Sequence, residues 1–261
     1  MIKFAPLFFI AFWCFLLDSL NVSAYPASSR PAYFELKVYH ISNGRQEAII
    51  DSFLQREYLP AMHAAGISNI GVFKPIGNDT TADKKIYVFI PFQSLKQWEK
   101  LENQPIRPKN IPGEYTNAAF NKPAYNRIET IFIKALDEMT ELRAPSLETP
   151  KKERVYELRS YEGASEKIFQ NKVQMFNAGG EIKLFSRLGF NGIFYGKVIF
   201  GSKMPNLMYM TSFKNMQARE EHWKTFSSDP EWKKLSSMQE YQNNVSHMDI
   251  AFLKPTDYSD L

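Results

Sequence analysis

Residues 155–161 read Val-Tyr-Glu-Leu-Arg-Ser-Tyr, and residues 33–39 read Tyr-Phe-Glu-Leu-Lys-Val-Tyr. Both stretches alternate as a β-strand does, with successive side chains pointing to opposite faces of a sheet. In each stretch a glutamate, a basic residue and a tyrosine share one face; the two sets are Glu35, Lys37 and Tyr39, and Glu157, Arg159 and Tyr161. The sequence therefore predicts two related strands, one at the start of each half of the protein.

The likeness between the two halves continues beyond these strands. Residues 86–92 correspond to residues 207–213, and residues 127–129 correspond to residues 247–249. Repetition at so long a period indicates duplicated domains rather than a solenoid. Each half reads as strand, helix, strand, strand, helix, strand, which predicts an α+β protein of two tandem ferredoxin-like units. Such a unit leaves one sheet face uncovered, so we expect the two sheets to pack together into one α/β barrel within the chain.

Punctuating residues divide the two units into their elements. We expect the first helix of the first unit to bend near Pro60 and to end at Gly66. The long helical pattern of the second unit is expected to break at Gly179-Gly180. Asp229, followed by a proline, predicts the start of a later helix.

Four segments follow from these patterns. A signal peptide is expected over residues 1–24, and the first ferredoxin-like unit over residues 25–140. A polar, proline-containing linker is expected over residues 141–152, and the second unit over residues 153–261.

The N-terminal segment has the pattern of a secretory signal. Lys3 precedes an apolar run over residues 4–17, and small residues end at Ala24, which predicts cleavage before Tyr25. The alternative is a transmembrane anchor, but the run is shorter than the roughly 20 residues that a membrane span needs. We therefore expect an exported protein, periplasmic or secreted, without stable membrane insertion after cleavage. Its only cysteine, Cys14, lies in the signal, so the mature protein should form no disulfide.

Charge and motif content exclude several classes of site. The 32 Lys and Arg residues and 28 Asp and Glu residues leave a net charge of +4 without a basic block, so we expect no nucleic-acid partner. The four histidines show no metal-ligand spacing, and no glycine-rich phosphate loop follows a strand. We therefore expect no metal and no cofactor.

The second half resembles the NIPSNAP family. The motifs that carry the resemblance are Tyr156-Glu157-Leu158-Arg159-Ser160-Tyr161, Arg187-Leu188-Gly189-Phe190, residues 205–210, His222-Trp223-Lys224, Asp229-Pro230-Glu231-Trp232 and residues 252–259. The first half is similar through residues 34–39 and 123–129, but it lacks the Asp-Pro-Glu-Trp element. The resemblance implies an exported bacterial member with the dimeric α/β-barrel fold. It brings no settled reaction and no catalytic residues.

The charged strand residues are the candidate site. We expect the first strand of each unit to lie between its third and fourth strands, with its charged face lining the barrel. The barrel-lining set is Glu35, Lys37, Tyr39, Arg127, Glu129, Glu157, Arg159, Tyr161, His247 and Asp249. Two interpretations remain open: these groups pair among themselves, since buried charges are costly unpaired, or they surround a polar or anionic ligand held by Arg159.

Three functions remain open. A small-molecule-binding protein comes first, because a barrel provides a lined cavity. The alternative is a cofactor-independent oxygenase or isomerase, which the resemblance to this fold suggests. The third is a protein-interaction module with a closed barrel. Whether the chain is an enzyme, and whether whole chains associate into a homo-oligomer, stays undecided at this level.

Overall fold

The computed structural model describes residues 1, 32–103 and 113–261 of the 261-residue chain. Apart from Met1, the expected signal peptide lies outside the described residues. Within the described part, no helix is both long and apolar enough to cross a membrane.

Among its described residues, the first unit has four strands and three α-helices. Its elements are β1 (Tyr33–Ile41), α1 (Gly44–Phe53), α2 (Leu59–Ala64), β2 (Gly71–Pro75), β3 (Lys84–Phe92), α3 (Leu95–Glu102) and β4 (Arg127–Ala135). A π-helical turn, Leu54–Tyr58, joins α1 to α2 and lies immediately before Pro60, as expected of a proline that cannot continue regular α-helical bonding. Gly66 then ends α2 in a left-handed conformation with φ 82°.

The second unit repeats this order with divided helices. Its elements are β5 (Val155–Glu162), α4 (Glu166–Phe176), α5 (Glu181–Arg187), β6 (Asn191–Phe200), β7 (Asn206–Phe213), α6 (Met216–Ser228), α7 (Pro230–Ser237) and β8 (His247–Pro255). The break between α4 and α5 falls at Gly179-Gly180, as predicted, and Gly180 has φ 89°. The side chain of Asp229 caps α7 by accepting hydrogen bonds from two backbone N–H groups, which confirms the predicted helix start.

The eight strands found in the described part of the chain form one closed antiparallel barrel in the order β1-β3-β2-β8-β5-β7-β6-β4. β1 lies between β3 and β4, and β5 lies between β7 and β8, as predicted. The two units meet where β2 pairs with β8 and where β4 pairs with β6. The fold is therefore the expected pair of ferredoxin-like units closing an α/β barrel within one chain; the expected segment boundaries stay a prediction.

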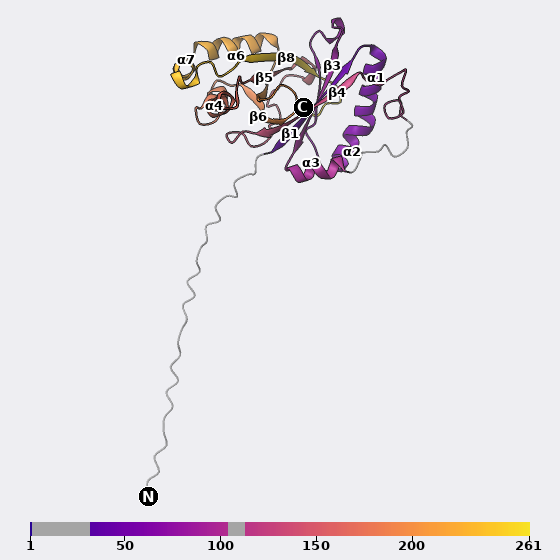
Figure 1. Cartoon of the computed structure of the whole chain (residues 1–261), viewed down its shortest axis with the longest axis horizontal. Helices are drawn as coiled ribbons and strands as arrows, with labels where there is room; N and C mark the ends of the chain where they lie inside the picture. Colours follow the sequence, from indigo (N-terminus) through magenta and orange to yellow (C-terminus); the bar gives the residue numbers. More distant parts are fainter. Residues whose placement is uncertain (2–31, 104–112) are drawn as a thin grey trace.

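The helices cover the outside of the barrel on two sides. α1 and α2 lie beside the strands of the first unit, and α4, α6 and α7 lie on the other side of the barrel (Figure 1). The barrel interior has its own apolar core, drawn from both units. Phe34 and Phe89 stack with ring centroids 5.2 Å apart, and Phe89 stacks on Phe194 at 4.4 Å. These rings fill part of the interior.

Candidate functional site

The barrel has a cavity of about 610 Å³ with an apolar floor. The floor includes Leu36 and Val38 of β1, Ile131 of β4, Leu158 of β5 and Met208 of β7. Four antiparallel steps around the barrel separate β1 from β5, so these two strands run in the same direction. Their C-terminal ends therefore lie at the same mouth of the barrel, where both units contribute polar side chains.

One buried polar group at this mouth is the imidazole of His40. His40 is 3% exposed and lies near the end of β1. Its Nδ1 lies 2.8 and 3.0 Å from the two carboxylate oxygens of Asp83, which precedes β3. Its Nε2 lies 3.1 Å from Nη2 of Arg127 and 3.1 Å from Oε1 of Glu129. A histidine thus connects a carboxylate on one side with a guanidinium and a second carboxylate on the other.

The carboxylates around His40 are held in their charged form. Partial burial acts to raise the pKa of Glu129, but the hydrogen bond from Arg127 and the nearby His40 outweigh it, so the pKa lies below its usual value. Burial likewise acts to raise the pKa of Asp83, and the contacts with His40 and Lys85 lower it further than burial raises it. Burial raises the pKa of the cavity-lining Tyr87 to about 12, so its hydroxyl stays protonated at neutral pH.

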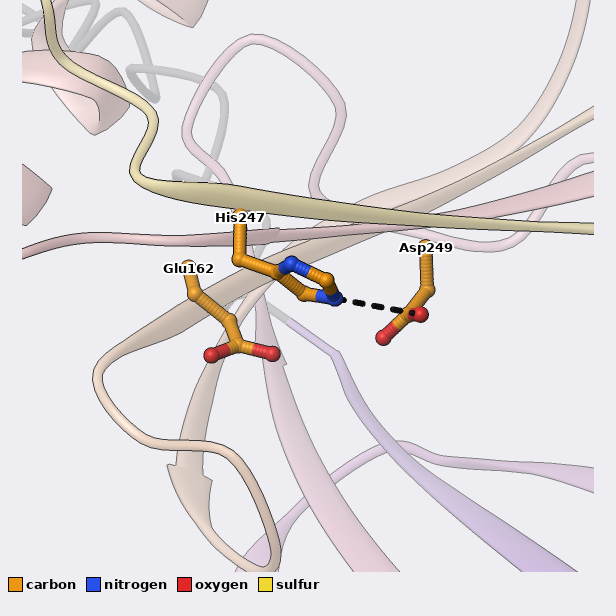
Figure 2. A group of neighbouring side chains, drawn as sticks. All are labelled: Glu162, His247 and Asp249. Carbon is orange, nitrogen blue, oxygen red and sulfur yellow. Dashed lines mark hydrogen bonds and ion pairs between the residues drawn. The ribbon is translucent and has the colours of Figure 1, made fainter.

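The second unit places a matching trio on its own side of the mouth. Figure 2 shows the imidazole of His247 lying between the carboxylates of Glu162 and Asp249. The His247 Nε2 lies 3.4 Å from Oδ1 of Asp249, and Lys203 forms a close ion pair with that same carboxylate.

The two units place equivalent trios at the mouth, namely His40, Arg127 and Glu129 in the first unit and Glu162, His247 and Asp249 in the second. His40 is opposite Arg127 across the β1–β4 pair, and Glu162 is opposite His247 across the β5–β8 pair. Glu129 follows Arg127 by two residues, as Asp249 follows His247. The units have therefore kept the backbone register and changed the side chains.

The trio of the second unit has ligand types that suit a divalent cation. One atom from each of its side chains lies within 4.8 Å of the others. However, the carboxylate of Asp249 is already neutralised by Lys203, and the His247 side chain is 59% exposed. The arrangement is explained by these ion pairs, and the expectation of no metal stays a prediction.

The structure corrects the position of six predicted site residues. Glu35, Lys37, Tyr39, Glu157, Arg159 and Tyr161 point from β1 and β5 toward the helices, not into the barrel. Period-two alternation shows which side chains share a face, but not which face the helices cover. The predicted placement of Glu157 and Arg159 beside Asp249 is wrong for the same reason, because Asp249 is opposite Ser160 on the other face. Of the predicted set, Arg127, Glu129 and Asp249 line the cavity, and His247 lies beside Asp249 without lining it.

The carboxylate of Glu157 is the centre of a buried network beneath α6. It accepts hydrogen bonds from Arg159 Nε at 2.7 Å, from Arg219 Nε and Nη2 at 2.9 Å each, and from Trp223 Nε1 at 2.8 Å. The guanidinium of Arg159 also lies 3.7 Å from the centroid of the Trp223 ring and donates to the Tyr161 hydroxyl at 2.9 Å. These contacts tie β5 to the helix layer, so Trp223 is a core residue with a specific polar role.

The first unit has a poorer version of this network. Lys37 Nζ lies 3.1 Å from Oε1 of Glu35. The indole Nε1 of Trp98 on α3 is buried without a hydrogen-bond partner among the described residues. Burial raises the pKa of Glu35 above its usual value, although the charge of Lys37 acts to lower it.

Sequence reasoning missed His40 and Asp83 as cavity residues. His40 alternates with Leu36 and Val38 along β1, and this spacing places all three on one face. The strand alternation therefore marks His40 as a barrel-facing residue, although the histidines have no metal-ligand spacing. Asp83 has no such signal, because it reaches His40 through the pairing of β3 with β1.

The comparisons with known proteins agree with the duplicated barrel. Residues 156–260 match the NIPSNAP family model. The second unit is therefore a NIPSNAP domain. No match was found among curated protein sequences.

Solved structures of similar fold span nearly the whole chain. A monooxygenase-like protein from Lactobacillus acidophilus NCFM is 11% identical with a TM-score of 0.55, covering 87% of this chain and 94% of that one. One from Fusobacterium nucleatum subsp. nucleatum ATCC 25586 is 7% identical with a TM-score of 0.59, covering 87% and 93%. An anthrone oxidase-like protein is 9% identical with a TM-score of 0.54, covering 88% and 93%. At these identities the likeness shows the fold alone.

Proposed function

We propose that this NIPSNAP protein binds a small molecule in the barrel cavity. The observation that carries the proposal is the apolar floor beneath a mouth where polar groups converge, together with a volume inside the range of about 300–1,000 Å³ usual for ligand sites. An apolar ligand body would lie on Leu158 and Met208, with its polar end near His40 and Arg127. This arrangement favours ligand binding over an interaction module with a filled barrel.

The charges of the mouth support a ligand that is neutral overall. The cavity lining carries the carboxylates of Asp83, Glu129 and Asp249 and the cationic groups of Lys85, Arg127 and Lys203, so the two signs balance. Arg159, which was expected to hold an anionic ligand, is committed to Glu157 beneath the helices. A neutral, largely apolar molecule with one polar group fits this lining better than a strong anion.

The test is a ligand screen by native mass spectrometry, with a variant that fills the cavity floor. Leu158→Trp should weaken binding of any hit at least tenfold, equivalent to about 1.4 kcal/mol, because the indole occupies the space of the ligand body. Leu95→Trp is the matched control, since Leu95 is exposed on α3 away from the cavity. Hits that bind both variants equally would show that the ligand lies elsewhere.

The alternative is a cofactor-independent oxygenase or isomerase that uses the same cavity. The His40–Asp83 pair favours it, because a histidine oriented by a carboxylate is a common general base. Incubating each hit with the protein and following its consumption, with and without oxygen, separates turnover from binding.

We also propose that the protein is exported, with cleavage between Ala24 and Tyr25. The charge at Lys3, the apolar run and the small residues before Tyr25 support this. N-terminal sequencing of protein from an expressing bacterium should begin at Tyr25; an intact Met1 in the membrane fraction would refute the proposal.

A further inference from the structure

His40 has a hydrogen-bond partner for each of its protonation states. In the neutral ring, Nδ1–H donates to Asp83, and the lone pair of Nε2 accepts from Nη2 of Arg127, 3.1 Å away. In the charged ring, Nε2–H donates instead to Oε1 of Glu129, also 3.1 Å away. A buried polar group without a partner is costly, and here neither state leaves one. The imidazole can therefore gain or lose a proton without rearrangement of the barrel.

This property belongs to the first unit. The equivalent position of the second unit holds Glu162, and its histidine, His247, is largely exposed beside Asp249. Among the four histidines of the chain, His40 is the one that is buried. The buried imidazole of the cavity thus comes from the half of the chain that the NIPSNAP family model does not match.

We propose that His40 is the proton acceptor of the cavity, for a ligand with an apolar body and one weakly acidic hydroxyl group. The proposal rests on the small-molecule function proposed above and names its chemistry. Arg127 Nη2 gives up its contact with the Nε2 lone pair to the incoming hydroxyl group; the hydroxyl O–H bond then breaks, its electron pair stays on the ligand oxygen, and the proton forms an N–H bond at Nε2 of His40. The guanidinium of Arg127 then lies beside the new oxyanion, and Asp83 and Glu129 stabilise the imidazolium.

A ligand with a weakly acidic hydroxyl group fits the charges around Nε2 of His40. The mouth balances its charges, so the ligand enters neutral. The guanidinium beside Nε2 favours the ligand only once it has become an anion, which couples proton loss to tighter holding. Asp83 acts as a positioning residue, because its contact with Nδ1 leaves Nε2 as the basic nitrogen.

Two chromophoric probes separate proton transfer from binding. 4-Nitrophenol carries the acidic hydroxyl, and 4-nitroanisole has the same body without the proton. At a pH where free 4-nitrophenol is mostly neutral, the protein should bind it as the coloured phenolate and hold it more tightly than 4-nitroanisole. Titration calorimetry gives the affinities, and the visible spectrum gives the ionised fraction.

His40→Gln should lower the ratio of bound phenolate to bound phenol roughly tenfold, equivalent to one pKa unit of the probe. The affinity for 4-nitroanisole, which has no acidic proton, should fall by a smaller factor than the affinity for 4-nitrophenol. His63→Gln is the matched control, because His63 also pairs with a carboxylate, Asp260 at 2.9 Å, but lies on α2 and does not line the cavity. Asp83→Asn should lower the ratio by a smaller factor. Because the Asp83 side chain is 52% exposed, this variant should fold even if His40→Gln does not.

The outcomes are distinguishable. Phenolate that persists in both His40→Gln and Asp83→Asn, or a probe bound only as the neutral phenol, overturns the role of His40 and leaves the cavity function standing. Failure of both probes to bind the unaltered protein, in a cavity that also yields no hit in the ligand screen, overturns the proposed function itself.

Discussion

The Glu157 network predicts that substitution of Glu157 destabilises the protein far more than the same substitution of the equivalent Glu35. Glu157 is fully buried and accepts hydrogen bonds from Arg159, Arg219 and Trp223. Glu157→Gln keeps the shape but removes the charge, so two guanidiniums lose their counter-ion. Breaking a buried pair costs about 3–5 kcal/mol, and we expect the lower end, because the Arg219 side chain is 17% exposed and can turn toward water.

The matched substitution in the first unit is Glu35→Gln. Glu35 contacts one lysine, Lys37, whose side chain is 21% exposed and can be solvated once the glutamate charge is gone. Burial already makes the charged form of Glu35 unfavourable. We therefore expect this substitution to change the free energy of unfolding at neutral pH by less than about 1 kcal/mol, or to stabilise the protein.

The two glutamates also predict opposite pH dependences. Burial acts to raise the pKa of Glu157, but Arg219 and Arg159 bring it below its usual 4.5; its stabilisation is present above that value and is lost as the pH falls through the lowered pKa. The pKa of Glu35 is raised by burial, so its contribution is present below 4.5 and is lost as the pH rises through the raised pKa. In a plot of the free energy of unfolding against pH, Glu157→Gln should reduce the fall in stability at acidic pH. Glu35→Gln should remove the loss of stability that the charging of Glu35 causes as the pH rises above 4.5.

Urea unfolding of the three proteins between about pH 3 and pH 7 tests both statements. A double variant, Glu157→Leu with Arg159→Leu, should lose less stability than the sum of its single changes, because each single change leaves the partner unpaired. The reasoning is refuted if Glu157→Gln costs no more than Glu35→Gln at neutral pH, or if the acid limb keeps its slope in Glu157→Gln.

Three further outcomes follow from the fold. Residues 25–140 and 153–261 expressed separately should associate or aggregate, because each exposes the barrel-facing side of its sheet; soluble monomers melting at the temperature of the whole chain would contradict the shared barrel. Lys172→Met should lower the free energy of unfolding by about 3–5 kcal/mol at neutral pH, because Lys172 Nζ lies 2.9 Å from the carboxylate of buried Glu181. This cost, measured by urea unfolding, should be smaller in acid, because burial raises the pKa of Glu181 and the unpaired carboxylate then takes up a proton. Gly66→Ala should lower stability by about 1 kcal/mol in thermal melts, through its positive φ alone, because no atom crowds the added methyl group.

The sequence predicted the duplication, the strand order and the helix breaks, because these depend on local signals repeated in both halves. Pro60, Gly66, Gly179-Gly180 and Asp229 each act within a few residues of their position, so their effects could be read without knowing the rest of the fold. The central positions of β1 and β5 followed from the ferredoxin-like order itself.

The site could be predicted only in part, because the identity of a strand face depends on tertiary packing. Both faces of β5 are almost wholly buried, one by the barrel and one by helices. The charges of Glu157 and Arg159, on one face of the strand, are typical of a sheet surface that contacts water or a ligand. The residues that neutralise the pattern, Arg219 and Trp223, lie about sixty positions later on α6. Nothing near β5 in the sequence indicated them.

The tandem arrangement explains how one barrel mouth acquires two unlike sides. If two identical units paired to close such a barrel, each residue of the mouth would appear twice, and a histidine on one side would oppose its own copy. In the single chain, the position of His40 is matched by Glu162, and that of Arg127 by His247. The second unit keeps the stronger strand-to-helix network around Glu157, while the first carries the buried imidazole. Duplication followed by divergence therefore gives the two halves different side chains at equivalent positions of one mouth, and exchanging His40 and Glu162 should remove the proposed proton transfer without opening the barrel.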